Sequence, residues 1–132
     1  MAQLPIIRVL LADDNDTLLN GLEVVLEMFD DLELVGEAST GLEAVNLCEQ
    51  LQPDVVLMDL VMPEMDGVAA TQIIRQKYPA IQIIALTSFD DEKLVQSAIQ
   101  AGVSDYMLKN VSIDQLATAI RNAYNGKLKA IL

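Results

Sequence analysis

The sequence predicts a single α/β domain in which helices cover both faces of a doubly wound, five-stranded parallel sheet. Short apolar runs alternate five times with segments whose apolar residues recur every three or four positions, the pattern of strands followed by amphipathic helices. The connections are short, so each strand must reach the next through a right-handed crossover. A chain of 132 residues is long enough for one such domain with a sizeable core.

The first half of the chain contains three predicted strands and two predicted helices. The opening strand is nearly all apolar and stops at a run of acidic residues, where Asp16 is expected to cap the first helix. The pair Asp30-Asp31 interrupts that helix, and Pro53 follows the second. The predicted ranges are a strand at 6–12, a helix at 16–29, a strand at 34–38, a helix from 41 to about 52 and a strand at 55–58.

The second half repeats the alternation after a loop that contains Pro63 and closes at Gly67. Gly102 is expected to end the fourth helix, and Ser112 is expected to cap the fifth. Asn125-Gly126 is a turn signal, so we expect the domain to occupy residues 1–125 and residues 126–132 to begin a linker or a tail. The predicted ranges are a helix at 68–77, a strand at 81–86, a helix at 91–101, a strand at 104–108 and a helix at 112–124.

Composition excludes several classes of function. The formal net charge is −12, from 20 acidic and 8 basic residues, so this chain alone should not bind nucleic acid strongly. Without histidine it cannot use Ser-His-Asp or Cys-His catalysis or a His-ligated zinc. The single cysteine, Cys48, has the spacing of a buried core thiol. No secretory signal or membrane-spanning run is visible, so we expect a cytoplasmic protein.

Polar residues follow four of the five predicted strands. They are Asp13 and Asp14 after the first, Asp59 after the third, Thr87 after the fourth and Lys109 after the fifth. Parallel strands end at one edge of the sheet, where ligands of such folds bind. If the first and third strands are neighbours, as in the order 2-1-3-4-5 of flavodoxin-like folds, three carboxylates converge there. A hard cation with oxygen ligands, Mg²⁺, would relieve their repulsion and bring a phosphoryl oxygen to the site.

Each of these residues also has an ordinary structural interpretation. Asp13 and Asp14 could cap the first helix, and Thr87 taken alone is most simply a turn residue. Lys109 could be a solvated surface charge, and a tyrosine at 106 could be a half-buried strand aromatic. Asp59 is harder to explain in this way, because a carboxylate at the end of a buried strand needs a partner.

The ordered set of residues resembles the receiver domains of two-component response regulators, which have a flavodoxin-like (CheY-like) fold. The resemblance extends from Ile6 to about Asn125. It rests on Asp13-Asp14, on Asp59 with Met62-Pro63 and Gly67, and on Thr87, Tyr106 and Lys109.

The resemblance implies a role for each matched position. Asp59 would be the phosphoacceptor and would take a phosphoryl group from a phosphohistidine on a sensor histidine kinase. Asp14, Asp59 and the backbone carbonyl of Val61 would bind Mg²⁺ directly, and Asp13 would act largely through water. Lys109 would pair with the phosphoryl oxygens.

The remaining matched positions would form the switch. Thr87 would donate its hydroxyl to the phosphoryl group, and Tyr106 would rotate inward as Thr87 moves. The chain would then be a signalling switch and not an enzyme.

Two positions depart from the common receiver pattern. Asn110 follows Lys109 where many receivers have a proline in a cis peptide bond, a geometry that costs about 2.5–4 kcal/mol without proline. Val61 lies two residues after Asp59, and its apolar side chain cannot orient a water molecule, so we expect slow self-dephosphorylation.

Details around Ala12, 65–71 and 101–110 are similar to receivers that precede a LuxR-type helix-turn-helix domain (NarL type). This resemblance implies control of transcription through a DNA-binding domain outside this chain, and a possible homodimer on phosphorylation. A stand-alone receiver that acts through protein contacts is the alternative. A Mg²⁺-dependent aspartyl-phosphate phosphatase is disfavoured by Val61, where a second acid is needed. An FMN carrier is disfavoured by the acidic loop after the first strand.

Overall fold

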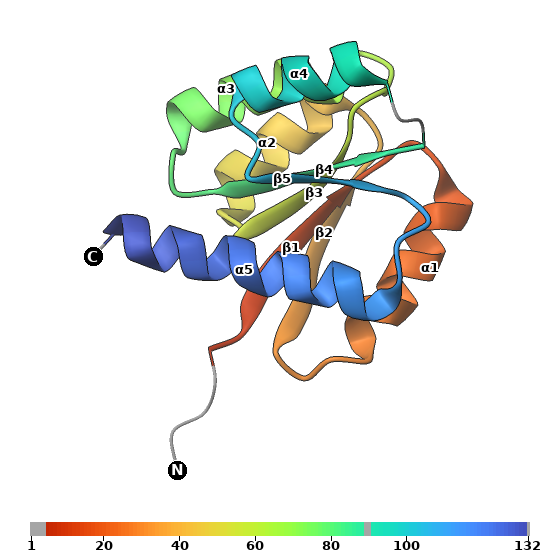
Figure 1. The fold of residues 1–132 in the computed structure, drawn as a ribbon, viewed down its shortest axis with the longest axis vertical. Helices are drawn as coiled ribbons and strands as arrows, with labels where there is room; N and C mark the ends of the chain where they lie inside the picture. Colours follow the sequence, from red (N-terminus) through yellow and green to blue (C-terminus); the bar gives the residue numbers. More distant parts are fainter. Residues whose placement is uncertain (1–4, 89–90, 132) are drawn as a thin grey trace.

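The computed structural model describes residues 5–88 and 91–131, and it contains the expected five strands and five helices in strict alternation (Figure 1). Residues 1–4 of the predicted domain, and residue 132 of the predicted tail, lie outside the described residues. The strands are β1 (Ile7–Ala12), β2 (Leu32–Ala38), β3 (Val55–Asp59), β4 (Gln82–Thr87) and β5 (Asp105–Leu108). The helices are α1 (Asp16–Glu27), α2 (Gly41–Leu51), α3 (Gly67–Lys77), α4 (Glu92–Ala101) and α5 (Ile113–Ile131).

The five strands form one parallel sheet in the order β2-β1-β3-β4-β5, which confirms the predicted topology. Helices α1 and α5 cover one face, and α2, α3 and α4 cover the other (Figure 1). The central strand β3 is buried along its whole length, as its continuous apolar run predicts. Each face of the sheet therefore has a core of its own between strands and helices.

Most helix ends follow the predicted capping signals. Gly102 ends α4 with a φ of +109°, and the Ser112 hydroxyl accepts a hydrogen bond from the Gln115 N–H at 3.1 Å. The prediction for α1 was wrong, because Asn15 is the cap: its side chain accepts from the Leu18 N–H at 3.1 Å. Asp16 is instead the first residue of the helix, where an acidic side chain is favoured by the helix dipole.

The thiol of Cys48 lies in the core between the sheet and α2, as expected. It is fully buried, and this burial raises its pKa to about 12. Such a thiol stays protonated at neutral pH and is a poor nucleophile. No helix among the described residues is both long enough and apolar enough to cross a membrane.

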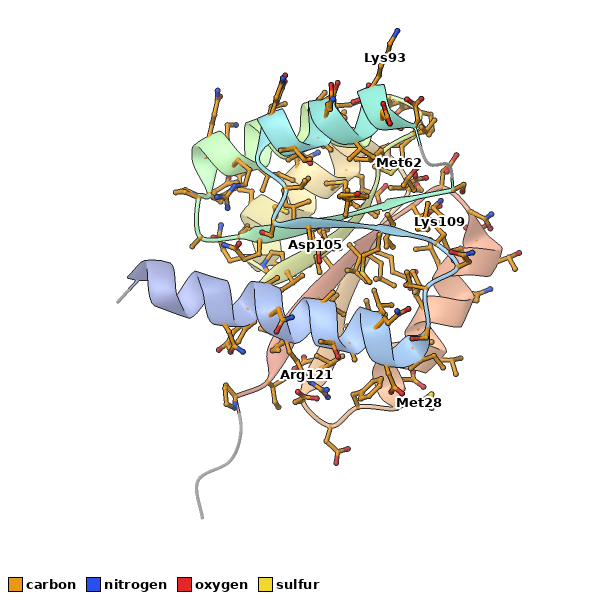
Figure 2. The ribbon with its side chains drawn as sticks, viewed as in Figure 1. Met28, Met62, Lys93, Asp105, Lys109 and Arg121 are labelled. Carbon is orange, nitrogen blue, oxygen red and sulfur yellow. The ribbon has the colours of Figure 1, made fainter. Side chains whose placement is uncertain are left out.

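Helix α5 continues past the point where the sequence predicted its end. Asn125-Gly126 does not form a turn, and the helix runs on to Ile131. The Lys127 ammonium lies 2.6 Å from Asp54 Oδ1 at the start of β3, and both side chains are largely buried. Arg121, labelled in Figure 2, pairs with Asp31 at 2.8 Å in the segment between α1 and β2. These two contacts hold the helix against the rest of the domain.

Replacing Gly126 by Ala tests this continuation directly. Nothing lies within 4 Å of the position of an added Cβ, so alanine should raise the free energy of unfolding by about 0.5–1 kcal/mol through its higher helix propensity. Urea unfolding measures the change. Gly21→Ala in α1, where an added Cβ also meets nothing within 4 Å, should give a gain of the same size. If Gly126→Ala lowered stability while Gly21→Ala raised it, α5 would end at Gly126.

A pair of acidic side chains between β2 and α1 makes the stability of the protein depend on pH. Glu37 on β2 faces Glu23 on α1, and the pKa of Glu37 is raised from 4.5 to about 7. The causes are a hydrogen bond with Glu23, partial burial, and the negative charges of Glu23 and Asp16. The folded state thus binds this proton more tightly than the unfolded state does. Its stabilising effect is complete below about pH 4.5 and is lost as the pH rises through about 7.

Glu37→Gln should therefore stabilise the protein more at pH 8 than at pH 5. Because the carboxyl groups are partly exposed, we expect a difference of only about 1 kcal/mol. Urea unfolding of wild type and variant at both pH values measures it. Glu33→Gln, at an exposed position of the same strand, should change stability equally at the two pH values. Equal effects of Glu37→Gln at pH 5 and pH 8 would contradict the assignment.

Candidate functional site

The candidate site lies at the carboxyl edge of the sheet, where β1 and β3 end side by side. Ala12 of β1 is in register with Met58 of β3, so the next residues, Asp13 and Asp59, are neighbours in space. Asp59 is likewise in register with Leu86 of β4. The parallel order of the strands, and not proximity in the sequence, therefore brings the carboxylates together.

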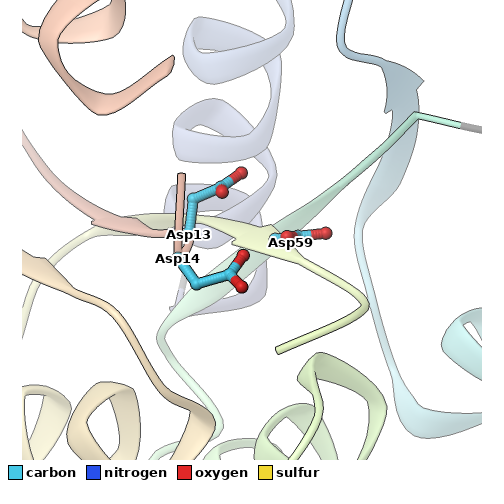
Figure 3. A group of neighbouring side chains, drawn as sticks. All are labelled: Asp13, Asp14 and Asp59. Carbon is cyan, nitrogen blue, oxygen red and sulfur yellow. The ribbon is translucent and has the colours of Figure 1, made fainter. Parts of the chain in front are cut away.

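Three carboxylates face one another at this edge (Figure 3). Asp13, Asp14 and Asp59 each offer an oxygen atom, and these atoms all lie within 4.8 Å of one another. The side chains differ in exposure: Asp13 is 2% exposed and Asp59 6%, whereas Asp14 opens to solvent. The predicted convergence of the acidic residues is confirmed.

Lys109 enters the same cluster from the end of β5. Its Nζ atom lies 2.8 Å from Asp13 Oδ2 and 3.2 Å from Asp59 Oδ2. Burial alone would lower the pKa of Lys109, but its contacts with the two carboxylates outweigh burial and raise it. The ammonium group therefore remains charged at neutral pH. This contact excludes the interpretation of Lys109 as a solvated surface charge.

The groups around Asp59 at the end of β3 shift its pKa in opposite directions. Burial raises the pKa of Asp59, and the neighbouring Asp13 carboxylate raises it further. The Val61 N–H, which donates to Asp59 Oδ1 at 3.2 Å, and the Lys109 ammonium lower it. The net shift is upward, so this carboxylate is costly to ionise and gains from further positive charge.

The cluster fits a divalent cation. With all three carboxylates ionised, three negative charges face one ammonium group, which leaves a local charge of −2. Among the described residues the Asp14 side chain makes no ion pair or hydrogen bond, and it lies at the exposed side of the cluster. The donors are all oxygen atoms, which favours a hard cation such as Mg²⁺.

The remaining predicted residues lie around this cluster. Thr87 is buried at the end of β4, and its carbonyl oxygen accepts from the Lys109 N–H at 2.9 Å. Tyr106 is 45% exposed on β5, and the Val61 side chain is 63% exposed beside Asp59. The Lys109–Asn110 peptide bond is trans, in keeping with the cost of a cis bond before a residue other than proline.

One feature of the loop between β3 and α3 was not predicted from the sequence. Glu64 and Met65 have positive φ angles of +55° and +116°, and the Met65 carbonyl accepts from the N–H of Gly41 in α2 at 2.9 Å. A residue pattern cannot reveal this contact, because it joins two segments more than twenty positions apart. A glycine directly after the cap of α2 is its only trace in the sequence.

Comparison with known proteins agrees with this geometry. Residues 9–121 match the family described as the response regulator receiver domain. The chain is 47% identical over 123 residues to the transcriptional regulatory protein LiaR of Bacillus subtilis, covering 93% of this chain and 58% of that protein. It is 40% identical over 121 residues to the response regulator protein VraR of Staphylococcus epidermidis, with 92% and 58% coverage. The chain thus spans little more than half the length of these relatives.

Solved structures show the same likeness. A two-component response regulator of the LuxR family from Aurantimonas matches with a TM-score of 0.86 and 31% identity, over 92% of this chain and 86% of that one. The signal receiver domain of a NarL regulator from Mycobacterium tuberculosis matches with a TM-score of 0.89 and 27% identity, over 93% and 99%.

Proposed function

Because this chain belongs to the response-regulator receiver family, whose members are signalling switches and not enzymes, we propose that phosphorylation of Asp59 controls it. One observation carries the proposal: Asp59 is buried at the end of β3 within an oxygen cluster that holds a single cation, Lys109. A carboxylate in this position is a suitable nucleophile for a phosphoryl group, because Lys109 and the oxygen donors for a cation are already in place beside it.

The phosphoryl donor would be a phosphohistidine on a sensor histidine kinase. An Asp59 carboxylate oxygen would attack the phosphorus atom, the bond from phosphorus to the histidine nitrogen would break, and an acyl phosphate would form. Lys109 would exchange its contact with Asp59 for the phosphoryl oxygens. Thr87, at the neighbouring strand end, would donate its hydroxyl to the same oxygens.

The metal ligands would be Asp13, Asp14, Asp59 and the Val61 carbonyl, with Asp13 acting largely through water. A bound Mg²⁺ would neutralise the charge that the phosphoryl group brings into an acidic site. The local charge of −2 that the cluster carries when all three carboxylates are ionised supports this assignment.

Phosphorylation would act on the rest of the protein by changing the shape of one surface of the domain. As Thr87 moves toward the phosphoryl group, Tyr106 would rotate inward and change the face formed by α4 and β5. Transcription would be controlled through a DNA-binding domain outside these residues, with residues 126–132 leading toward it. The acidity of the chain supports this division of labour. Phosphorylation would take place in the cytoplasm and could promote a homodimer.

The proposal is tested by incubating the chain with acetyl phosphate, with Mg²⁺ or with EDTA, and measuring its intact mass. We expect a mass increase of one phosphoryl group with Mg²⁺ and none with EDTA. Beryllofluoride should produce fluoride-dependent spectral shifts under the same metal requirement. Equal phosphorylation with and without Mg²⁺ would contradict the metal assignment, and no adduct from any donor would contradict the proposed function.

The phosphoryl group should be long-lived, because the exposed Val61 side chain cannot orient an attacking water molecule. Val61→Asn supplies an amide that can, and one hydrogen bond of about 1 kcal/mol would speed hydrolysis roughly fivefold. The decay of the phosphorylated mass after removal of the donor measures both rates. Val61→Ala, which is also apolar, should leave the lifetime unchanged. A wild-type half-life of seconds would contradict the role of this position.

A further inference from the structure

The loop between β3 and α3 has a backbone conformation that its own residues do not favour. Glu64 and Met65 are consecutive, neither is glycine, and both have φ angles in the left-handed range, at +55° and +116°. L-residues adopt this range at a cost and keep it only when surrounding structure imposes it. Some contact outside the loop must therefore hold these two residues in place.

Gly41, the first residue of α2, provides that contact. Its N–H donates to the Met65 carbonyl at 2.9 Å, next to the Thr40 side chain that caps the helix. A Cβ at position 41 would overlap the Met65 carbonyl oxygen and come within 2.7 Å of its carbon atom. The close approach of helix and loop thus requires a glycine here, and any side chain would push the loop away.

The other end of the same loop is fastened at the candidate site. The Gly67 N–H donates to the Leu60 carbonyl at 3.1 Å, which closes the loop at its base. Val61 lies just inside this base, and its N–H donates to Asp59 Oδ1 at 3.2 Å. The loop that carries Val61 is therefore fixed at two places, by β3 and by α2.

We propose that Gly41 is a positioning residue for the cation site. It does not touch the cluster; its N–H holds the Met65 carbonyl, and so keeps the loop in the conformation in which the Val61 N–H contacts Asp59 and in which, under the proposed function, the Val61 carbonyl would bind the cation. This inference rests on the proposed function, in which that carbonyl is a Mg²⁺ ligand. A ligand held in position before binding raises affinity, and loss of such outer support lowers metal affinity roughly tenfold to a hundredfold.

Calorimetric titration of the purified chain with MgCl₂ tests the proposal. Gly41→Ala should bind Mg²⁺ roughly tenfold to a hundredfold more weakly than wild type. Gly21→Ala in α1, where an added Cβ meets nothing within 4 Å, should bind as wild type does. Thermal unfolding of each variant shows whether it is folded at the temperature of the titration. A lower Mg²⁺ affinity can then be attributed to the folded protein and not to unfolding.

A second variant separates positioning from mere stability. Met65→Gly added to Gly41→Ala gives the loop freedom to move away from the new methyl group. We expect the double variant to regain thermal stability while its Mg²⁺ affinity stays low. Wild-type affinity in the freed loop would overturn the proposal, because the loop would then not need a fixed shape.

Hydrogen exchange of the metal-free wild type provides a measurement that needs no variant. The Gly41 amide should exchange slowly without Mg²⁺, because its acceptor is already in place. Fast exchange at Gly41, or a Gly41→Ala variant with unchanged Mg²⁺ affinity, would overturn the positioning role of Gly41 but not the proposed function of the chain. A wild-type chain that binds no Mg²⁺ would instead overturn the proposed function, and this inference with it.

Discussion

Asp59→Asn is expected to abolish phosphorylation of the chain by acetyl phosphate in the presence of Mg²⁺. The amide has nearly the shape of the carboxylate but no negative oxygen to attack phosphorus, and the two other carboxylates of the cluster cannot take its place at the end of β3. Intact mass before and after incubation measures the loss, with wild type phosphorylated in parallel.

The same substitution should not unfold the protein. Burial and the Asp13 charge raise the pKa of Asp59, so its ionised form is costly in the folded state, and a neutral amide removes this cost. Lys109 keeps its contact with Asp13. We therefore expect Asp59→Asn to unfold at a urea concentration equal to or above that of wild type.

Asp66→Asn is the matched control, since it makes the same chemical change seven residues away. Asp66 caps α3 by accepting from the Ala69 N–H at 2.8 Å, and asparagine caps a helix equally well. This variant should be phosphorylated as wild type is. A phosphate adduct of unchanged yield in Asp59→Asn would refute the assignment of the phosphoacceptor.

Gly67→Ala is expected to lower the free energy of unfolding by about 3 kcal/mol. A Cβ at this position would overlap the backbone carbonyl oxygen of Asp59 and come within 2.8 Å of the Leu60 Cα atom. These are main-chain atoms at the end of a buried strand, so no side-chain rotation can relieve the overlap. The strand end itself must shift.

Urea unfolding of Gly67→Ala measures this loss, and Gly21→Ala is again the control because its new methyl group meets nothing within 4 Å. The shift of the strand end should also reduce phosphorylation of the folded fraction, since Asp59 moves with it. A loss below about 0.5 kcal/mol, the range of ordinary surface substitutions, would show that α3 can move away from β3 at little cost.

Gly41 and Gly67 lie where helices approach the ends of the loop between β3 and α3, and neither residue carries a functional group. Gly67 lets α3 begin against the end of β3, and Gly41 lets α2 approach the far side of the loop. Both positions exclude a side chain for reasons of space. The acidic cluster is thus supported by a framework in which α2, α3 and β3 meet within a few residues.

The elements themselves could be predicted from the sequence with small errors at their ends. Continuous apolar runs and helical spacing are properties of neighbouring residues, so they identify β3 and its terminal Asp59 without knowledge of the fold. Capping residues are equally local, which is why Ser112 was predicted correctly. The prediction of Asp16 as the cap was wrong because the residue before it, Asn15, is an equally good cap, and only the path of the chain after Asp13 selects one.

The end of α5 shows the opposite situation. Asn125-Gly126 favours a turn on local grounds, and a helix can pass through it when tertiary contacts outweigh that preference. Here Lys127 reaches Asp54, seventy-three positions earlier in the chain, and the helix continues. No pattern of residues near Gly126 contains that information.

The sequence by itself determined which residues end each strand, and hence that acidic, hydroxyl and ammonium groups share one edge of a parallel sheet. Only the tertiary structure decided which of them touch: that β1 lies beside β3, that Lys109 reaches both Asp13 and Asp59, and that α2 holds the loop after Asp59. The physical reason is the distance along the chain over which each kind of interaction acts. Periodicity and capping act over a few residues, whereas strand order and close packing are settled by the burial of the whole core.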